Sequence, residues 1–109
     1  MAEAEQGPLP EGAPVPGNVV YVGRKPALVY AVAALTRLTE NPAGVILKAR
    51  GQSISRAVDA QQILQRRFLG NQVQVKEIKI GTETMPPREG EGLRERNVST
   101  IEITIVKTG

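Results

Sequence analysis

Two cations, a glycine and two serines follow one another closely in the segment 48–56, which reads KARGQSISR. The apolar VIL before it predicts a strand in which Lys48 and Arg50 share one face, because strand side chains alternate. A glycine turn then leads into a helix near Ser53 or Ser55. Cations beside the backbone N–H groups of a helix start are suited to holding an anion such as phosphate. A solvated strand end with an ordinary serine cap is the alternative interpretation.

A second pair of cations, Arg24 and Lys25, follows a predicted strand over 18–22 and precedes a helix predicted over 27–39. The helix dipole disfavours cations at a helix N-terminus. The pair therefore indicates either a site that an outside anion completes or two exposed charges without a function.

A long polar segment, 84–97, separates the last two predicted strands and contains Arg88, Arg94 and Arg96. Long polar loops on small domains are often functional. These arginines could reach into a groove of a partner, or they could belong to a solvated loop in which three glutamates balance their charge.

The charge of the chain is divided unevenly. Residues 1–17 contain four prolines, three glycines and three glutamates but no Lys or Arg, a composition that predicts a flexible, disordered tail. Residues 18–109 hold all 14 Lys and Arg residues and 8 acidic ones, a net charge of +6. A small domain with this excess is expected to bind polyanions, with nucleic acid as the first candidate.

Most enzyme designs are excluded because the sequence has no cysteine and no histidine. Zinc–thiolate sites, cysteine nucleophiles and histidine bases all need one of them. A P-loop, paired carboxylates and a metal-ligand cluster are also missing from the pattern, so neither enzymatic activity nor a cofactor is expected. The sequence shows neither a membrane-spanning apolar run nor a signal-peptide pattern, which predicts a cytoplasmic protein.

The predicted elements alternate and then end in two strands, which gives a βαβαββ order. A strand–helix–strand unit implies a right-handed crossover, so the first two strands should pair in parallel. The third strand shows a shift in its apolar phase between Val75 and Ile78, which indicates either a bulge or a change in which face of the strand is covered. The predicted strands cover 18–22, 45–50, 72–83 and 98–107, and the predicted helices cover 27–39 and 55–68.

The helical periodicity predicts which side chains enter the core. Leu28, Val32 and Leu35 form one stripe of the first helix, with Ala31, Ala34 and Leu38 close by. This helix carries only one strong charge and is therefore expected to be largely buried. Val58 and Phe68 lie near one face of the second helix, together with other apolar residues.

Three segments resemble one known family: 18–26 (NVVYVGRKP), 48–59 (KARGQSISRAVD) and 98–103 (VSTIEI). They are similar to the Alba (Sac10b-like) family of archaeal chromatin proteins, and the similarity extends over about 18–107. The resemblance implies an Alba-like domain over 18–109 with an α+β fold, an α/β two-layer sandwich. Its βαβαββ order would match the C-terminal domain of translation initiation factor three, with a long hairpin between strands three and four.

The resemblance also implies a homodimer, or a heterodimer with a paralogue, that coats double-stranded DNA and also binds RNA. It assigns the hairpins to two arms that read the minor groove, and it places Arg67 and Phe68 in a region of dimer–dimer contact. Some members carry an acetylated lysine where this chain has Arg24, and a basic residue can occur where it has Gln52. The predicted nucleic-acid-binding residues are Arg24, Lys25, Lys48, Arg50, Gln52, Ser53, Arg56, Arg88, Arg94 and Arg96.

Three functions remain open at this point. Sequence-independent binding and compaction of DNA is the first, because the chain offers many cations but no evident base-reading helix. A primarily RNA-binding protein, such as a ribonucleoprotein subunit or an RNA chaperone, is the second. The third is a phosphate-handling enzyme that would use Asp59 or the loop glutamates, and the missing catalytic groups disfavour it.

Overall fold

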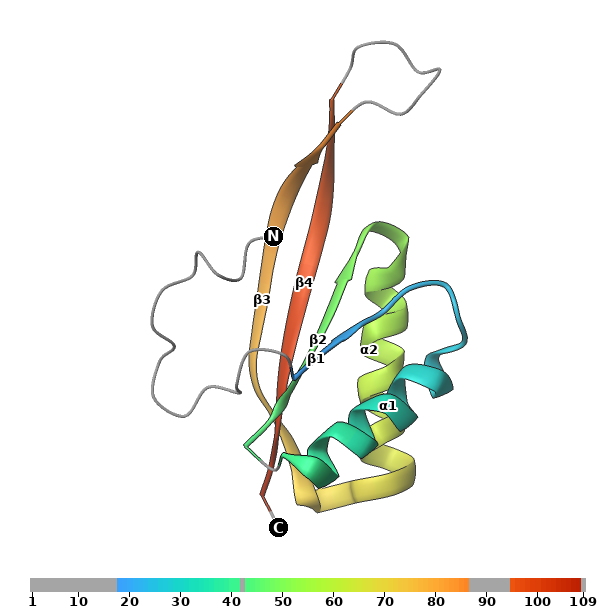
Figure 1. Ribbon diagram of the computed structural model, residues 1–109, viewed down its shortest axis with the longest axis vertical. Coiled ribbons are helices and arrows are strands. Elements are labelled where there is room, and N and C mark those ends of the chain that lie inside the picture. The colour runs from blue at the N-terminus through green and yellow to red at the C-terminus, as the bar shows by residue number, and fades with distance from the viewer. Residues whose placement is uncertain (1–17, 42, 87–94, 109) are drawn as a thin grey trace.

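The computed structural model describes residues 18–41, 43–86 and 95–108, and the predicted tail 1–17 lies outside these residues. Two helices cover one face of a four-stranded sheet in a two-layer arrangement (Figure 1). The elements are β1 (Val19–Tyr21), α1 (Ala27–Glu40), β2 (Val45–Arg50), the 3-10 turn η2 (Gly51–Ser53), α2 (Ile54–Ile63), the π-helix η3 (Leu64–Leu69), the 3-10 turn η4 (Gly70–Gln72), β3 (Val73–Met85) and β4 (Arg96–Lys107).

The sheet has the strand order β1-β2-β4-β3. β1 pairs with β2 in parallel, as the crossover argument predicts, with Val20 opposite Leu47. β4 lies antiparallel between β2 and β3, so the long hairpin of β3 and β4 forms the other half of the sheet. The α+β fold and its βαβαββ order are thus confirmed.

The predicted bulge in β3 is present, because its register with β4 shifts between Val75 and Glu77. The extra residue keeps Val75 and Ile78 on the same face of the sheet, opposite Ile105 and Ile103 respectively. Strand pairing continues as far as Met85 opposite Arg96, so the hairpin strands extend into the predicted loop 84–97.

The core lies between the sheet and the helices. Val45, Leu47 and Ala49 of β2 are buried, and so are Ile103 and Ile105 of β4. The alternate residues Ile46, Lys48 and Arg50 therefore lie on the opposite face, which we call the open face because no helix covers it.

The helices contribute both small and large side chains to the core, and the burial prediction is wrong for Leu28, Val32 and Val58. Ala31 and Ala34 of α1 are fully buried, whereas Leu28 and Val32 are 44% and 45% exposed. On α2, Ala57, Ala60 and Gln61 are buried, whereas Val58 is exposed. Small residues allow α1 and α2 to lie close to each other and to the sheet. Leu38 of α1 and Leu64 of η3 are fully buried as well, so Leu28, Val32 and Val58 are the large apolar side chains that the core leaves at the surface. Within the described ranges, no helix is long and apolar enough to cross a membrane.

Candidate nucleic-acid interface

Three segments that carry predicted site residues lie at one end of the molecule (Figure 1). They are the loop between β1 and α1, the turn η2 between β2 and α2, and the distal part of the β3–β4 hairpin. The topology explains this grouping, because parallel strands end at the same edge of a sheet. β4 begins beyond the end of β2 and pairs with it from Thr100, opposite Arg50, so the hairpin extends past this edge.

Arg24 and Lys25 are exposed on the loop after β1. Behind them, the hydroxyl of buried Tyr30 accepts a hydrogen bond from the backbone N–H of Lys25 at 3.0 Å. A Cβ atom at Gly23 would lie 3.2 Å from the same hydroxyl, so Gly23 permits the close approach of loop and helix. Tyr30 of α1 thus fixes the backbone of the loop, while the side chains of Arg24 and Lys25 face solvent.

Ser53 and Arg56 make hydrogen bonds to the same loop. Arg56 Nη1 donates to the carbonyl oxygen of Gly23 at 2.7 Å, and Ser53 Oγ donates to it at 3.2 Å. Ser53 makes no side-chain cap on α2, so the simple serine-cap interpretation does not hold at this position. Both residues join the start of α2 to the loop after β1 and position Arg24 and Lys25.

Lys48 and Arg50 lie on the open face, as the alternation of β2 predicts. Lys48 Nζ lies 3.6 Å from a carboxylate oxygen of Glu102, and it also stands 5.9 Å from the ring centroid of Tyr21. Arg50 Nη1 donates to Glu83 Oε1 at 2.8 Å and lies 3.7 Å from the sulfur of Met85. Both cations are therefore tied to carboxylates of the hairpin.

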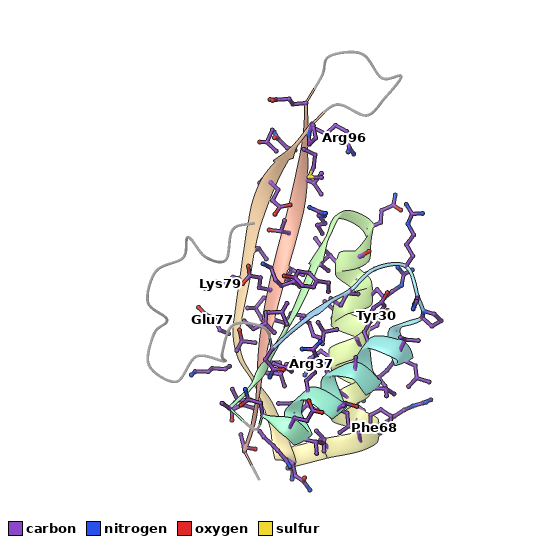
Figure 2. All side chains as sticks on the ribbon, in the orientation of Figure 1. Tyr30, Arg37, Phe68, Glu77, Lys79 and Arg96 are labelled. Carbon is purple, nitrogen blue, oxygen red and sulfur yellow. The ribbon has the colours of Figure 1, made fainter. Side chains whose placement is uncertain are left out.

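Of the remaining predicted residues, the structure describes Gln52 and Arg96. Gln52 is exposed on η2, directly after Gly51, whose φ of +59° favours glycine. Figure 2 shows Arg96 at the distal end of the hairpin. Arg88 and Arg94 lie outside the described residues, so the prediction that they belong to a groove-reading arm stays untested.

Two candidate residues escaped the sequence reasoning. Lys79 of β3 is exposed and stands opposite Glu102 in the strand register, so Glu102 lies between Lys48 and Lys79 across the sheet. Tyr21 is 69% exposed and flanks Lys48 in the same row. The alternation of Ile78 and Ile80 with Lys79 could have placed Lys79 on the polar face of β3. Its position opposite Glu102, however, depends on the strand register, which the bulge shifts.

The comparison with known families identifies the chain. A family model described as Alba matches residues 18–82, which include all the predicted site residues except Arg88, Arg94 and Arg96. The chain belongs to the Alba family.

Solved structures agree with this assignment. Alba from Thermoplasma volcanium matches with a TM-score of 0.70 and 39% sequence identity, over 81% of this chain and 98% of that one. ALBA1 from Trypanosoma brucei matches with a TM-score of 0.65 and 25% identity, over 87% of this chain and 73% of that one. Alba-family membership supports nucleic-acid binding as the general function, in a family whose members are generally not enzymes.

Arg67 and Phe68 of this Alba-family chain lie in η3, and Figure 2 shows Phe68 at the opposite end of the molecule from Arg96. Phe68 is 41% exposed and Arg67 is exposed as well. Phe68 is therefore only partly buried and remains available for contact with another protein. In the described part of the chain, no three His, Cys, Asp or Glu side chains gather in a group that could hold a metal ion.

Proposed function

We propose that this protein binds double-stranded DNA without sequence preference, and that it coats and compacts DNA as a homodimer while also binding RNA. The observation that carries the proposal is that Arg24 and Lys25, on the loop after β1, and Lys48 and Arg50, at the end of β2, belong to neighbouring parallel strands that end at the same edge of the sheet. Side chains that neutralise phosphates supply affinity for any sequence.

The arrangement of the helices supports a phosphate-based mode of binding. α1 and α2 pack against the sheet and against each other. The one described cation of the site that lies on a helix, Arg56, donates to the backbone carbonyl of Gly23, and the others come from a loop and from strand ends. A protein that reads base edges in the major groove commonly inserts a helix or a β-ribbon there. Here the hairpin is the element that projects from the body and could enter a groove (Figure 1).

The homodimer is supported by an apolar surface on the hairpin. Ile78 and Ile80 are 58% and 81% exposed, although they stand opposite Ile103 and Ile101, which are buried. Both therefore lie on the helix-facing side of β3, beyond the area that the helices cover (Figure 1). Contiguous apolar side chains in such a position are typical of a protein–protein interface. We infer that a second copy of the chain covers them, a proposal that measurement of the mass in solution tests directly.

Such a protein would act on the chromosome in the cytoplasm of an archaeal cell. A heterodimer with a paralogue would use the same apolar surface of β3, since a related chain would present similar residues there.

RNA as the principal ligand is the second candidate, and Tyr21 is the observation that favours it. Its ring is exposed at the end of β1, beside Lys48 and next to the loop of Arg24 and Lys25. Unpaired bases stack on exposed aromatic rings, whereas the bases of a duplex are already stacked.

Competition binding tests the two candidates against each other. Labelled duplex DNA is bound to the protein, and unlabelled duplex DNA or structured RNA with unpaired nucleotides is added at the same ionic strength. If DNA is the principal ligand, duplex DNA competes at least as well as the RNA. A large advantage of the RNA that disappears in Tyr21→Ala would instead establish the RNA-binding function.

A further inference from the structure

Two of the four central cations of the proposed interface already have carboxylate partners within the chain. Lys48 Nζ lies 3.6 Å from Glu102 Oε2, and Arg50 Nη1 lies 2.8 Å from Glu83 Oε1. Both carboxylates come from the β3–β4 hairpin, whereas both cations come from β2. A phosphate that approaches either cation on the open face therefore meets a carboxylate beside it.

Strand register places these pairs together. Glu102 stands directly opposite Lys48 in the antiparallel pairing of β2 with β4. Arg50 stands opposite Thr100, which in turn stands opposite Gly81, so Glu83 lies two residues further along β3 on the same face. The pairs consequently follow from the sheet itself and do not depend on a flexible loop.

The solvent exposure of the pairs indicates that stability is not their main effect. The side chains of Lys48 and Glu102 are 35% and 38% exposed, and those of Arg50 and Glu83 are 59% and 52% exposed. Exposed ion pairs contribute little to folding because water screens them and the side chains lose freedom. Such pairs can also exchange partners readily when a phosphate arrives.

We propose that Glu83 and Glu102 act as built-in counterions that weaken nucleic-acid binding by competing with phosphate for Arg50 and Lys48. The inference rests on the proposed function. A cation that leaves its carboxylate to bind phosphate also leaves behind a negative charge near the backbone of the nucleic acid. The freed carboxylate takes up a solution cation, which opposes the counterion release that drives binding. The two carboxylates thereby set both the affinity and its dependence on salt.

Neutral isosteres test the proposal. Glu83→Gln and Glu102→Gln are each compared with wild type on one labelled 20-base-pair DNA duplex and one labelled RNA hairpin, across a salt series. Glu40→Gln is the matched control, since it removes the same charge from the exposed C-terminal end of α1, outside both pairs. Each test variant should bind severalfold more tightly at low salt than this control. Each should also increase the magnitude of the log–log salt slope by up to about 0.9.

A second background separates a local effect from a general change of charge. In Arg50→Gln, the added substitution Glu83→Gln should give no gain beyond that of Glu40→Gln, because its partner is already gone. The proposal would be overturned if Glu83→Gln raised the affinity equally in wild type and in Arg50→Gln. It would also be overturned if Glu83→Gln and Glu102→Gln bound no more tightly than Glu40→Gln. Thermal melts identify a variant that binds weakly because it has unfolded. In that case Glu83→Asp and Glu102→Asp replace the glutamine variants, because they keep the charge but shorten the side chain. They should still bind more tightly than wild type. Failure of wild type to bind either nucleic acid would instead overturn the proposed function, and the inference with it.

Discussion

Replacing both Arg24 and Lys25 with alanine should weaken binding to every duplex alike. The loop that carries them should keep its position, because Tyr30 accepts from the backbone N–H of Lys25, and Arg56 and Ser53 donate to the backbone carbonyl of Gly23. None of these three hydrogen bonds involves a side chain that the substitutions remove. The free energy of unfolding should therefore change by no more than about 0.5 kcal/mol, as is usual for exposed positions.

The size of the effect follows from the number of phosphate contacts. Each lost contact should reduce the magnitude of the log–log salt slope by about 0.9, so two contacts give about 1.8. Between 50 and 200 mM salt, the advantage of wild type over the double variant should then shrink by about 12-fold. A smaller reduction, near 0.9, would mean that only one of the two side chains contacts a phosphate.

The assay is a salt series of affinities on two duplexes of unrelated sequence. A variant with Arg66→Ala and Lys107→Ala is the control, because it removes the same charge from the opposite end of the molecule (Figure 1). The reasoning would be refuted by a slope equal to that of wild type, by a loss confined to one sequence, or by an equal change of slope in the control.

Four further predictions address the loop, the surfaces and the tail. Tyr30→Phe removes a hydrogen-bond acceptor without changing charge, so thermal denaturation should show a cost of about 0.5–1.5 kcal/mol, and affinity should fall with an unchanged salt slope. Phe68→Ala should lower the free energy of unfolding by clearly less than the loss of a fully buried phenylalanine would, which is about 3–5 kcal/mol. It should reduce the cooperativity of binding to long DNA more than the affinity of a single dimer, and a large drop in melting temperature would contradict this. Ile80→Glu should yield a folded monomer in light scattering, whereas an intact dimer would move the interface elsewhere. Removing residues 1–17 should leave the melting temperature unchanged and tighten binding slightly in titrations, because three glutamates are lost.

The sequence alone determined the order of the elements and the faces of the strands. Alternation in 45–50 placed Lys48 and Arg50 together. The shift of apolar phase after Val75 indicated a bulge or a change of the covered face, and the register shows the bulge. These features depend on neighbouring residues, whose relative directions are fixed by the geometry of a strand. Local patterns therefore contained enough information to predict them.

The tertiary structure decided which helix side chains are buried and which polar side chains meet. Periodicity could not separate Ala31 from Leu28, because each belongs to a broad apolar surface of α1, and only close packing against α2 and the sheet selects the small residue. Arg56 meets the carbonyl of Gly23 across 33 positions of sequence, and Arg50 meets Glu83 across the same separation. Such contacts follow from strand order, register and the bulge acting together. Residue types therefore suggested the cations of the proposed interface, but only the fold determined which of them hold the loop and which are paired with carboxylates.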